Sequence, residues 1–474
     1  MKSSSLDRFL RVFTDVRDGE GVTALLMFAN VFLILCAYYF IKPLREGWIA
    51  VSAIEGLTKA EVKAYSSFLQ SVMLIPIVWL FGRLSSRWSR SKLITRATLF
   101  CMSNMAIFWV LQPRFFFETL PIAGIVFYLW VGMFGVFVVA QFWAFAADVY
   151  TDEHGKRLLP MIAIGATAGA AVGSWIAAQL SGAVSARDAG GGDGFTEWLL
   201  VVAMIPLGAS IFLTRRVDER ERPGGSEQRA VPPDQDSGRS GITLVFASRL
   251  LIAIAIITLL LNWVNTNGEN LLFWVVQDRL TEQAVVAGIT QPDPLLLFTR
   301  DGTTAFYGNF YFLVNIAALV LQAFVASRLL KYGGFSAIFL MLPVVALVSY
   351  SAMALIPVLA IVKLMKVAEN ATDYSINNTA RHVLFLPLSA EMKYKGKPAV
   401  DTFFVRTGDG LAALTMLIGV QLLDLSPDPF FVLNVGLVVL WLGLAFIVIR
   451  EHRRASERAA ARDAEPGVEE ALRA

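Results

Sequence analysis

Residues 430–449 read FFVLNVGLVVLWLGLAFIVI, a run without a charged side chain that ends at Arg450. A helix of about 20 apolar residues is long enough to cross the roughly 30 Å of hydrocarbon in a bilayer. Lipid offers no hydrogen-bond partner to a free backbone, so a helix is the expected structure of such a run. This stretch therefore predicts a membrane-spanning helix, and comparable runs recur back to Val22.

The composition of the whole chain supports the same interpretation. Of its 474 residues 56% are hydrophobic and only 17% are charged, whereas soluble domains average about 25% charged residues. We therefore expect an all-α integral membrane protein whose first partner is the lipid bilayer. Cys36 and Cys101 both lie in apolar runs, so neither a disulfide framework nor a metal site is expected. The net charge of +3 is too small to indicate nucleic-acid binding.

The apolar runs predict twelve spans. Their expected ranges are 22–44, 63–83, 92–112, 121–148, 158–181, 196–215, 243–277, 304–327, 335–355, 357–385, 399–424 and 429–450.

Basic residues indicate how these spans are oriented. With the N-terminus inside, the inner segments collect the basic groups at 83–96, 156–157, 215–222, 328–331, 393–397 and 450–454. The outer loops hold only Arg45, Lys59, Arg114, Arg187, Arg279 and Arg300. Because positive residues accumulate on the cytoplasmic side of membrane proteins, both termini are predicted to be cytoplasmic.

A polar stretch divides the predicted spans into two groups of six. Residues 217–242 are rich in Pro, Gly, Arg and Glu and read as a flexible cytoplasmic linker. The expected parts are an N-terminal segment 1–20, six-helix bundles 21–216 and 243–450, and a cytoplasmic tail 451–474. Gly155-Lys156 and Gly396-Lys397 begin corresponding spans, and Gly169 then matches Gly410. Such parallel repeats are typical of major-facilitator transporters, with a pseudo-two-fold axis and a cavity between the halves.

Ionisable side chains inside the tenth span are the main functional signal. At mid-bilayer each ionised group costs about 2.5–3.5 kcal/mol on insertion scales. The polar residues of this span recur every three or four positions, so they share one helix face. They are Lys363, Lys366, Glu369, Asn370, Asp373, Asn377 and Arg381. A helix that pairs with itself through Lys366–Glu369 and Lys366–Asn370 contacts is one interpretation; a helix that lines a wet cavity explains so wide a polar face better.

Three other spans carry polar faces. In the seventh span Asn262, Asn265, Thr266 and Glu269 share a face, and Asn267-Gly268 are expected to loosen the helix beside them; the amides would alternatively bond to other helices. Lys42 and Arg45 in the first span would either extend to the outer interface or form an anion site. Asp401, Thr402, Arg406 and Asp409 share a face of the eleventh span. By contrast, Gly165, Gly169 and Gly173 are expected to serve helix packing.

Several motifs resemble one family. Residues 38–46 (YYFIKPLRE), 142–146 (FWAFA), 371–375 (ATDYS) and 395–401 (KGKPAVD) are similar to segments of the nucleotide exchange transporters (ATP:ADP and NTP:NDP) of plastids and intracellular bacteria. The resemblance implies a major-facilitator-like fold, alternating access, a central nucleotide site and a bacterial inner-membrane location. It implies that Lys42, Arg45, Glu269 and Asp401 are functional positions.

The chain departs from the family pattern at three positions. Asp373 and Asp409 stand where the pattern has Lys, and Gly132 stands where it has Glu. Two carboxylates in place of two cations would repel phosphates, whereas Lys363, Lys366, Arg381 and Arg406 would attract them.

The sequence thus predicts a transporter that is monomeric, has no cofactor and is not an enzyme. Its substrate is expected to be an anionic or zwitterionic solute, ATP or ADP if the resemblance extends to substrate. The predicted substrate-binding residues are Lys42, Arg45, Asn265, Glu269, Lys363, Lys366, Asn370, Asp373, Asn377, Arg381 and Arg406. Candidates for coupling to protons are Glu269, Asp373, Asp401 and Asp409. A proton-coupled permease for another metabolite, and a membrane scaffold or sensor that does not transport, remain alternatives.

Overall fold

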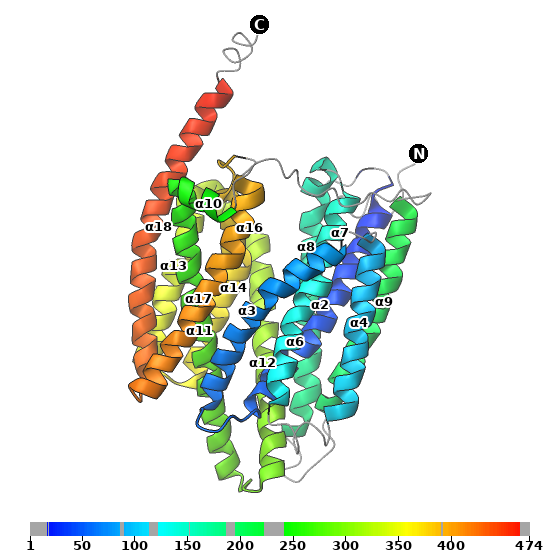
Figure 1. Cartoon of the computed structure of the whole chain (residues 1–474), viewed down its shortest axis with the longest axis vertical. Coiled ribbons are helices and arrows are strands. Elements are labelled where there is room, and N and C mark those ends of the chain that lie inside the picture. Colours follow the sequence, from blue (N-terminus) through cyan, green and yellow to red (C-terminus); the bar gives the residue numbers. More distant parts are fainter. Residues whose placement is uncertain are drawn as a thin grey trace. The chain divides into compact units, whose positions relative to one another are not determined.

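The computed structural model describes residue 17 and residues 19–85, 90–112, 122–150, 152–185, 195–221, 241–389 and 392–464. Within these ranges the chain is helical, as Figure 1 shows. The prediction of an all-α membrane protein is confirmed. Most of the linker (222–240), most of the N-terminal segment (1–16 and 18) and the end of the tail (465–474) lie outside the described residues.

The chain forms two compact units, and each is described by itself. Unit 1 comprises Met1–Pro233 and Trp274–Leu319, and unit 2 comprises Asp234–Phe273 and Val320–Ala474. The first boundary falls inside the predicted linker. The other two fall within long helices, so the seventh and eighth predicted spans each contribute residues to both units.

Unit 1 is built from long helices with two short segments of other helical types. Its elements are α2 (Gly21–Ala50), α3 (Lys59–Ser85), α4 (Arg90–Leu111), α6 (Ala123–Phe134), the π-helix η2 (Gly135–Val139), α7 (Ala140–Val149), α8 (Asp152–Ser185), the 3₁₀-helix η3 (Phe195–Trp198), α9 (Leu199–Glu221), the part of α11 (Arg249–Val286) from Trp274 onward, and α12 (Pro292–Leu321) up to Leu319.

Unit 2 contains more interruptions. Its elements are α10 (Gly241–Ala247), the start of α11, the π-helix η4 (Gln322–Ala326), α13 (Ser327–Leu355), α14 (Leu359–Thr372), η5 (Asp373–Asn377), α15 (Asn378–Leu384), η6 (Met392–Gly396), α16 (Lys397–Ala399), η7 (Val400–Phe404), α17 (Val405–Met416), η8 (Leu417–Leu422) and α18 (Pro427–Ala464). The segments η5 to η8 are also π-helices.

Apolar helices long enough to cross a membrane account for most of the described residues. Nine segments meet that requirement, and one of them, Pro292–Leu355, contains both α12 and α13. The tenth predicted span corresponds to α14, η5 and α15 together. The last span continues well past Arg450 as part of α18, so the first half of the predicted tail is helical.

Close packing of α8 on α2 organises unit 1. A Cβ atom added to Gly169 would lie 2.2 Å from the backbone oxygen of Phe32, and one added to Gly173 would lie 2.3 Å from that of Cys36. Small residues let membrane helices approach each other closely. The predicted packing role of these glycines is confirmed.

An aromatic core fills the other side of α2. The ring centroids of Trp48 and Phe127 lie 4.3 Å apart, and Phe127 and Trp130 are stacked at 5.7 Å. Trp48 and Phe127 are almost completely buried. This packing fixes the position of the polar residues at the C-terminal end of α2.

Two predictions about the seventh span are wrong. The predicted span 243–277 is two helices, since α10 ends at Ala247 and α11 begins at Arg249. In addition, α11 is continuous through Asn267 and Gly268, where an unwound segment was expected. The glycine serves close approach instead: a Cβ atom at Gly268 would lie 1.9 Å from the Tyr350 hydroxyl and 2.9 Å from Lys366 Nζ.

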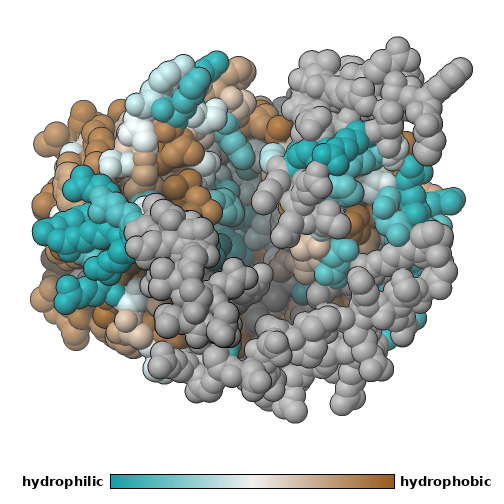
Figure 2. Space-filling model, turned by 90° about the horizontal axis from the view of Figure 1, so that it is seen from above, coloured by the Kyte–Doolittle hydropathy of each residue, from teal (hydrophilic) through white to brown (hydrophobic). Residues whose placement is uncertain are grey.

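The elements α10, α16 and the end of α18 lie at one end of unit 2 (Figure 1). Figure 2, which looks at this end, shows hydrophilic patches there, with hydrophobic side chains beside them. Large apolar side chains such as Phe446 and Ile447 on α18 are more than half exposed. Such a surface suits contact with lipid, with the basic residues at the end of the helices in the polar headgroup layer.

Candidate functional site

A buried lysine lies at the centre of the most polar group in unit 2, which we call the Lys366 cluster. It consists of Lys366, Glu369 and Asn370 on α14, Asn265 and Glu269 on α11, and Tyr350 on α13. The ammonium of Lys366 is 0% exposed and lies 2.8 Å from Glu369 Oε2 and 3.6 Å from Glu269 Oε1. It also donates to Asn265 Oδ1 at 3.3 Å.

The remaining members hold the two carboxylates in place. Asn370 Nδ2 donates to Glu269 Oε1 at 2.8 Å. The Tyr350 hydroxyl lies 3.2 Å from Glu369 Oε1 and 3.1 Å from the backbone oxygen of Val264, so it can donate to one of them at a time. A buried charge is stable only when it is paired and hydrogen-bonded, and this cluster meets that condition for Lys366.

The self-pairing interpretation of the tenth span holds in part. The predicted Lys366–Glu369 contact within α14 is present. The predicted Lys366–Asn370 contact is replaced, because Asn370 turns to Glu269 on α11. Self-pairing therefore satisfies one carboxylate, and the helix also reaches across to its neighbour.

The rest of the polar face forms smaller pairs. Asn377 Nδ2 donates to Asp373 Oδ1 at 2.7 Å, within η5. Arg381 forms an ion pair with Asp401 of η7. Lys363 is half-buried on α14 and belongs to neither pair.

Arg406 and Asp409 pair with each other on α17. Arg406 Nη1 lies 3.1 Å from Asp409 Oδ2, and Thr266 of α11 donates to Asp409 Oδ1 at 2.9 Å. Asp401 contacts the polar face of the tenth span through its ion pair with Arg381.

Unit 1 holds a second buried ionic group, the Glu46 cluster, made of Arg45, Glu46, Lys63 and Tyr307. Lys63 Nζ lies 3.0 Å from Glu46 Oε2, and these side chains are 3% and 1% exposed. Arg45 Nε donates to the other oxygen, Glu46 Oε1, at 3.0 Å. Lys63 also donates to the Tyr307 hydroxyl at 3.4 Å.

Aromatic rings surround the basic residues of this region. Lys42 Nζ lies 4.1 Å from the Tyr311 ring centroid and 5.0 Å from that of Tyr39. The Arg45 guanidinium lies 4.4 Å from the Tyr128 ring centroid. Rings at these distances attract a cation through their quadrupoles. Arg45 is only 13% exposed, so of the two interpretations offered for it, extension to the interface is disfavoured.

Sequence reasoning missed Glu46, Lys63 and Tyr350 as members of these clusters. Glu46 is adjacent to Arg45 in the quoted segment 38–46, and Lys63 stands at the predicted start of the second span. Charge inside or at the edge of an apolar run was the available signal for both. Tyr350 gave no such signal because an isolated tyrosine is ordinary in a membrane helix.

The structure gives a steric reason for glycine at position 132, where the nucleotide exchange transporters have glutamate. A Cβ atom there would lie 1.6 Å from Gln70 Nε2. Gln70 in turn donates to the backbone oxygen of Tyr128 at 3.4 Å. Any side chain at position 132 would displace Gln70, so a glutamate does not fit this arrangement.

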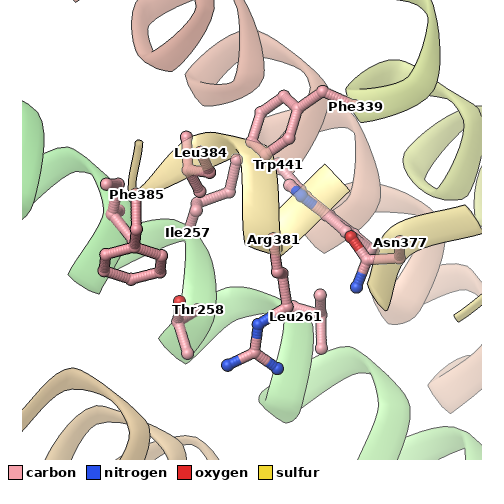
Figure 3. A pocket seen from close by; sticks show the side chains of 10 residues that line it. Ile257, Thr258, Leu261, Phe339, Asn377, Arg381, Leu384, Phe385 and Trp441 are labelled. Carbon is pink, nitrogen blue, oxygen red and sulfur yellow. The ribbon is translucent and has the colours of Figure 1, made fainter. Parts of the chain in front are cut away.

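A small pocket of unit 2 lies beside Arg381. Figure 3 shows Arg381, Asn377 and Thr258 among the apolar side chains that line it, which include Phe339 and Trp441. The space open to the centre of a water molecule is ≈ 20 Å³, about enough for one water. In this conformation the pocket therefore admits water and not a metabolite.

A carboxyl group with a perturbed pKa, that of Glu20, directly precedes α2 in unit 1. Burial alone would raise its pKa, but hydrogen bonds from the Arg157 guanidinium and the Arg17 backbone N–H, with the charges of Arg157 and His154, lower the pKa below its usual value. The guanidinium donates through two nitrogens, at 2.9 and 3.1 Å. This contact attaches the segment before α2 to α8.

Comparison with known proteins assigns the fold. No family model matches the chain, and no curated protein matches its sequence. Solved structures do match: a mutant form of the nucleoside transporter NupG has 13% identity and a TM-score of 0.59, over 90% of this chain and 99% of that one.

Two further structures agree. A POT family transporter in complex with 5-aminolevulinic acid has 12% identity and a TM-score of 0.57, over 91% of this chain and 96% of that one. A bacterial homologue of the human lysosomal transporter Spinster has 13% identity and a TM-score of 0.54, over 92% and 98%. The chain therefore has the fold of these transporters, the major-facilitator-like fold that the sequence predicts.

Proposed function

We propose that this protein is a membrane transporter for a small solute that carries a negative charge, and that it works by alternating access. The observation that carries the proposal is Lys366, a lysine with no exposed surface on a helix of the membrane region. A relic charge at this depth would be costly. Its retention, together with the carboxylates and amides around it, supports a binding role.

The charges of unit 2 favour a singly charged or zwitterionic solute over a polyanion. Its polar face combines four cations with five carboxylates. The cations are Lys363, Lys366, Arg381 and Arg406, and the carboxylates are Glu269, Glu369, Asp373, Asp401 and Asp409. Since carboxylates repel phosphates, ATP or ADP is the less favoured substrate, although the motif resemblance and the nucleoside transported by NupG make nucleotides and nucleosides natural first candidates.

The remaining predicted features belong to the same proposal. Lys42 and Arg45 would contribute positive charge in unit 1, where the Glu46 cluster carries more cations than carboxylates. Asn265, Asn370 and Asn377 would supply neutral hydrogen bonds to the solute. We propose that Glu269, Asp373, Asp401 or Asp409 couples transport to a proton, that the protein is a monomer of the bacterial inner membrane, and that both termini are cytoplasmic.

Uptake by proteoliposomes tests the function directly. Purified full-length protein is reconstituted, and uptake of radiolabelled ATP, nucleosides, amino acids and small organic acids is compared with that of empty liposomes. We expect saturable uptake or exchange of at least one anionic or zwitterionic solute. The absence of any such flux from a folded, reconstituted protein would contradict the proposal and favour a membrane scaffold or sensor.

Variants of the basic residues give the second part of the test. Lys42→Ala and Lys366→Gln are expected to lower uptake about tenfold or more, since each tenfold corresponds to roughly 1.4 kcal/mol of lost binding. Lys331→Ala is the matched control, because Lys331 is an exposed lysine at the start of α13. Uptake by the control should equal that of the wild type. If Lys42→Ala and Lys366→Gln proteins fold and transport normally, these residues are not part of the site.

A further inference from the structure

The two carboxylates around Lys366 are not equivalent. Glu369 lies 2.8 Å from the ammonium and its side chain is 4% exposed, whereas Glu269 lies 3.6 Å from it and is 23% exposed. Glu369 is on the same helix, one turn away, and is also within reach of the Tyr350 hydroxyl. Glu269 comes from α11. Glu369 is therefore the close, covered partner of Lys366, and Glu269 is the distant, accessible one.

One ammonium is sufficient to balance only one carboxylate. Two carboxylates near a single cation repel each other. The repulsion weakens the ion pair of the carboxylate that lies further from the cation. The amide of Asn370 also donates to Glu269, at 2.8 Å. Glu269 Oε1 thus receives one amide hydrogen bond and a long ionic contact, and both go to the same oxygen.

Lys366 is held against α11, whereas Glu269 is the more exposed of its two carboxylate partners. Because Gly268 has no side chain, Lys366 Nζ packs against the backbone of α11. A solute that reached Glu269 would meet the Lys366 ammonium and the Asn370 amide directly behind it. These two donors suit a single anionic oxygen, such as that of a carboxylate or a phosphate.

We propose that Glu269 is a displaceable counter-ion that occupies the place on Lys366 and Asn370 taken by the anionic oxygen of the solute. Binding of the solute moves Glu269 off Lys366, while Glu369 stays as the permanent partner. Glu269 therefore sets the affinity by competing with the solute, and it excludes anions too weak to replace it. This inference rests on the proposed transport function and names the chemistry of its site.

Anion binding to the full-length protein in detergent tests the inference. Inorganic phosphate and acetate serve as probes, and isothermal titration calorimetry gives the Kd. Glu269→Gln keeps the acceptor oxygen for Asn370 but removes the competing charge. We expect the Kd of this variant for at least one probe to fall about tenfold relative to wild type. Glu282→Gln, an exposed carboxylate further along α11, is the control and should leave the Kd unchanged.

Two more variants show whether a change in Kd comes from the charge of Glu269 and not from misfolding of Glu269→Gln. Glu269→Asp keeps the charge but shortens the side chain by one methylene, which should withdraw it from Lys366 and also lower the Kd. Lys366→Gln in the Glu269→Gln background should abolish the gain, because the gain requires the ammonium. An unchanged Kd in both Glu269 variants, or an equal gain without Lys366, would overturn the inference.

The two proposals fail in different ways. Proteoliposome uptake by the wild-type protein decides whether the chain transports an anion, and it does not depend on Glu269. If the wild type transports a solute and the Glu269 variants bind the probes no better, only the counter-ion role is wrong. If no variant binds phosphate or acetate, the counter-ion role is also wrong. The uptake measurement on the wild-type protein then decides independently whether the chain is a transporter.

Discussion

At the scale of single residues, the Glu46 cluster shows how costly a buried charge becomes when its partner is removed. Lys63→Met would leave Glu46, which is 1% exposed, with Arg45 as its remaining cation. Removing one member of a buried pair destabilises proteins by about 3–5 kcal/mol. Because Arg45 remains, we expect a loss near the lower end of that range, measured as a lower melting temperature of the detergent-purified protein.

The double variant Lys63→Met with Glu46→Gln provides the control for this prediction. It removes the negative charge together with its partner, so it should be more stable than Lys63→Met alone. Equal melting temperatures of the single and double variants would mean that the unpaired carboxylate is not the source of the loss.

Glu20 gives a prediction about pH. Its pKa is lowered in the folded protein, so the stabilisation is present above the unfolded pKa and is lost as the pH falls through the lower folded value. At pH 7 Glu20→Gln should therefore lower stability, by about 1–2 kcal/mol for a charge-assisted contact. Below the folded pKa, wild type and variant should become equally stable.

Thermal unfolding of both proteins between pH 7 and pH 3 checks this expectation. Glu219→Gln is a suitable control, since Glu219 is 69% exposed and its ion pair with Arg216 is long, at 3.9 Å. A difference between wild type and Glu20→Gln that does not change with pH would contradict the assigned role.

At the scale of helices, the contact between α2 and α8 depends on the absence of side chains. A Cβ atom at Gly169 would lie 2.2 Å from a backbone oxygen of α2, which cannot move aside as a flexible side chain can. Gly169→Ala should therefore separate the helices and destabilise unit 1 by about 1–3 kcal/mol, the usual cost of overpacking.

Gly182→Ala lies on the same helix and is the matched control. Its Cβ would be 4.0 Å from the Cβ of Ala305, an ordinary contact. Alanine is also the better helix former by about 1 kcal/mol, so this variant should be at least as stable as the wild type. Melting temperatures of the two variants in the same detergent decide between packing and intrinsic helix propensity.

The hydrophobic pattern predicted where the helices lie along the chain, but not where they contain π-helical segments. The apolar runs identified the core of each helix, because lipid leaves a helix as the only way to satisfy the backbone. The π-segments at 373–377 and 400–404 were not predictable, since one extra residue per turn leaves the apolar pattern almost unchanged. The prediction of an unwound segment at Gly268 was wrong because it relied on the conformational freedom of glycine. In the structure this glycine makes room for Tyr350 and Lys366.

The candidate site was predictable only in part. The polar stripe of the tenth span follows from residue spacing alone, and Lys366 does form the predicted contact with Glu369. Its contact with Glu269 joins residues nearly a hundred positions apart on different helices. Such a pairing depends on how α11 packs on α14, and a single sequence carries no information about that packing.

At the scale of the whole molecule, the distribution of basic residues predicts the orientation in the membrane. Arg450, Arg453 and Arg454 continue α18 directly beyond its apolar part, and Arg328 and Lys331 begin the described part of α13. Basic residues of this kind are retained on the cytoplasmic side. The connection between α11 and α12, residues 287–291, should then be on the outside, where Arg279 and Arg300 are the neighbouring basic residues.

Reporter fusions test this orientation in intact cells. Green fluorescent protein fused after Ala474 should fluoresce, because it folds in the cytoplasm. Alkaline phosphatase inserted at Gly288, an exposed glycine with a φ of 72° in that connection, should be active, because it requires the outer compartment. The same enzyme inserted at position 230 of the linker should be inactive. The reverse pattern would place the termini outside. Activity at both insertion points would place both on the outside, which requires an even number of spans between them and would contradict the predicted crossing by α11.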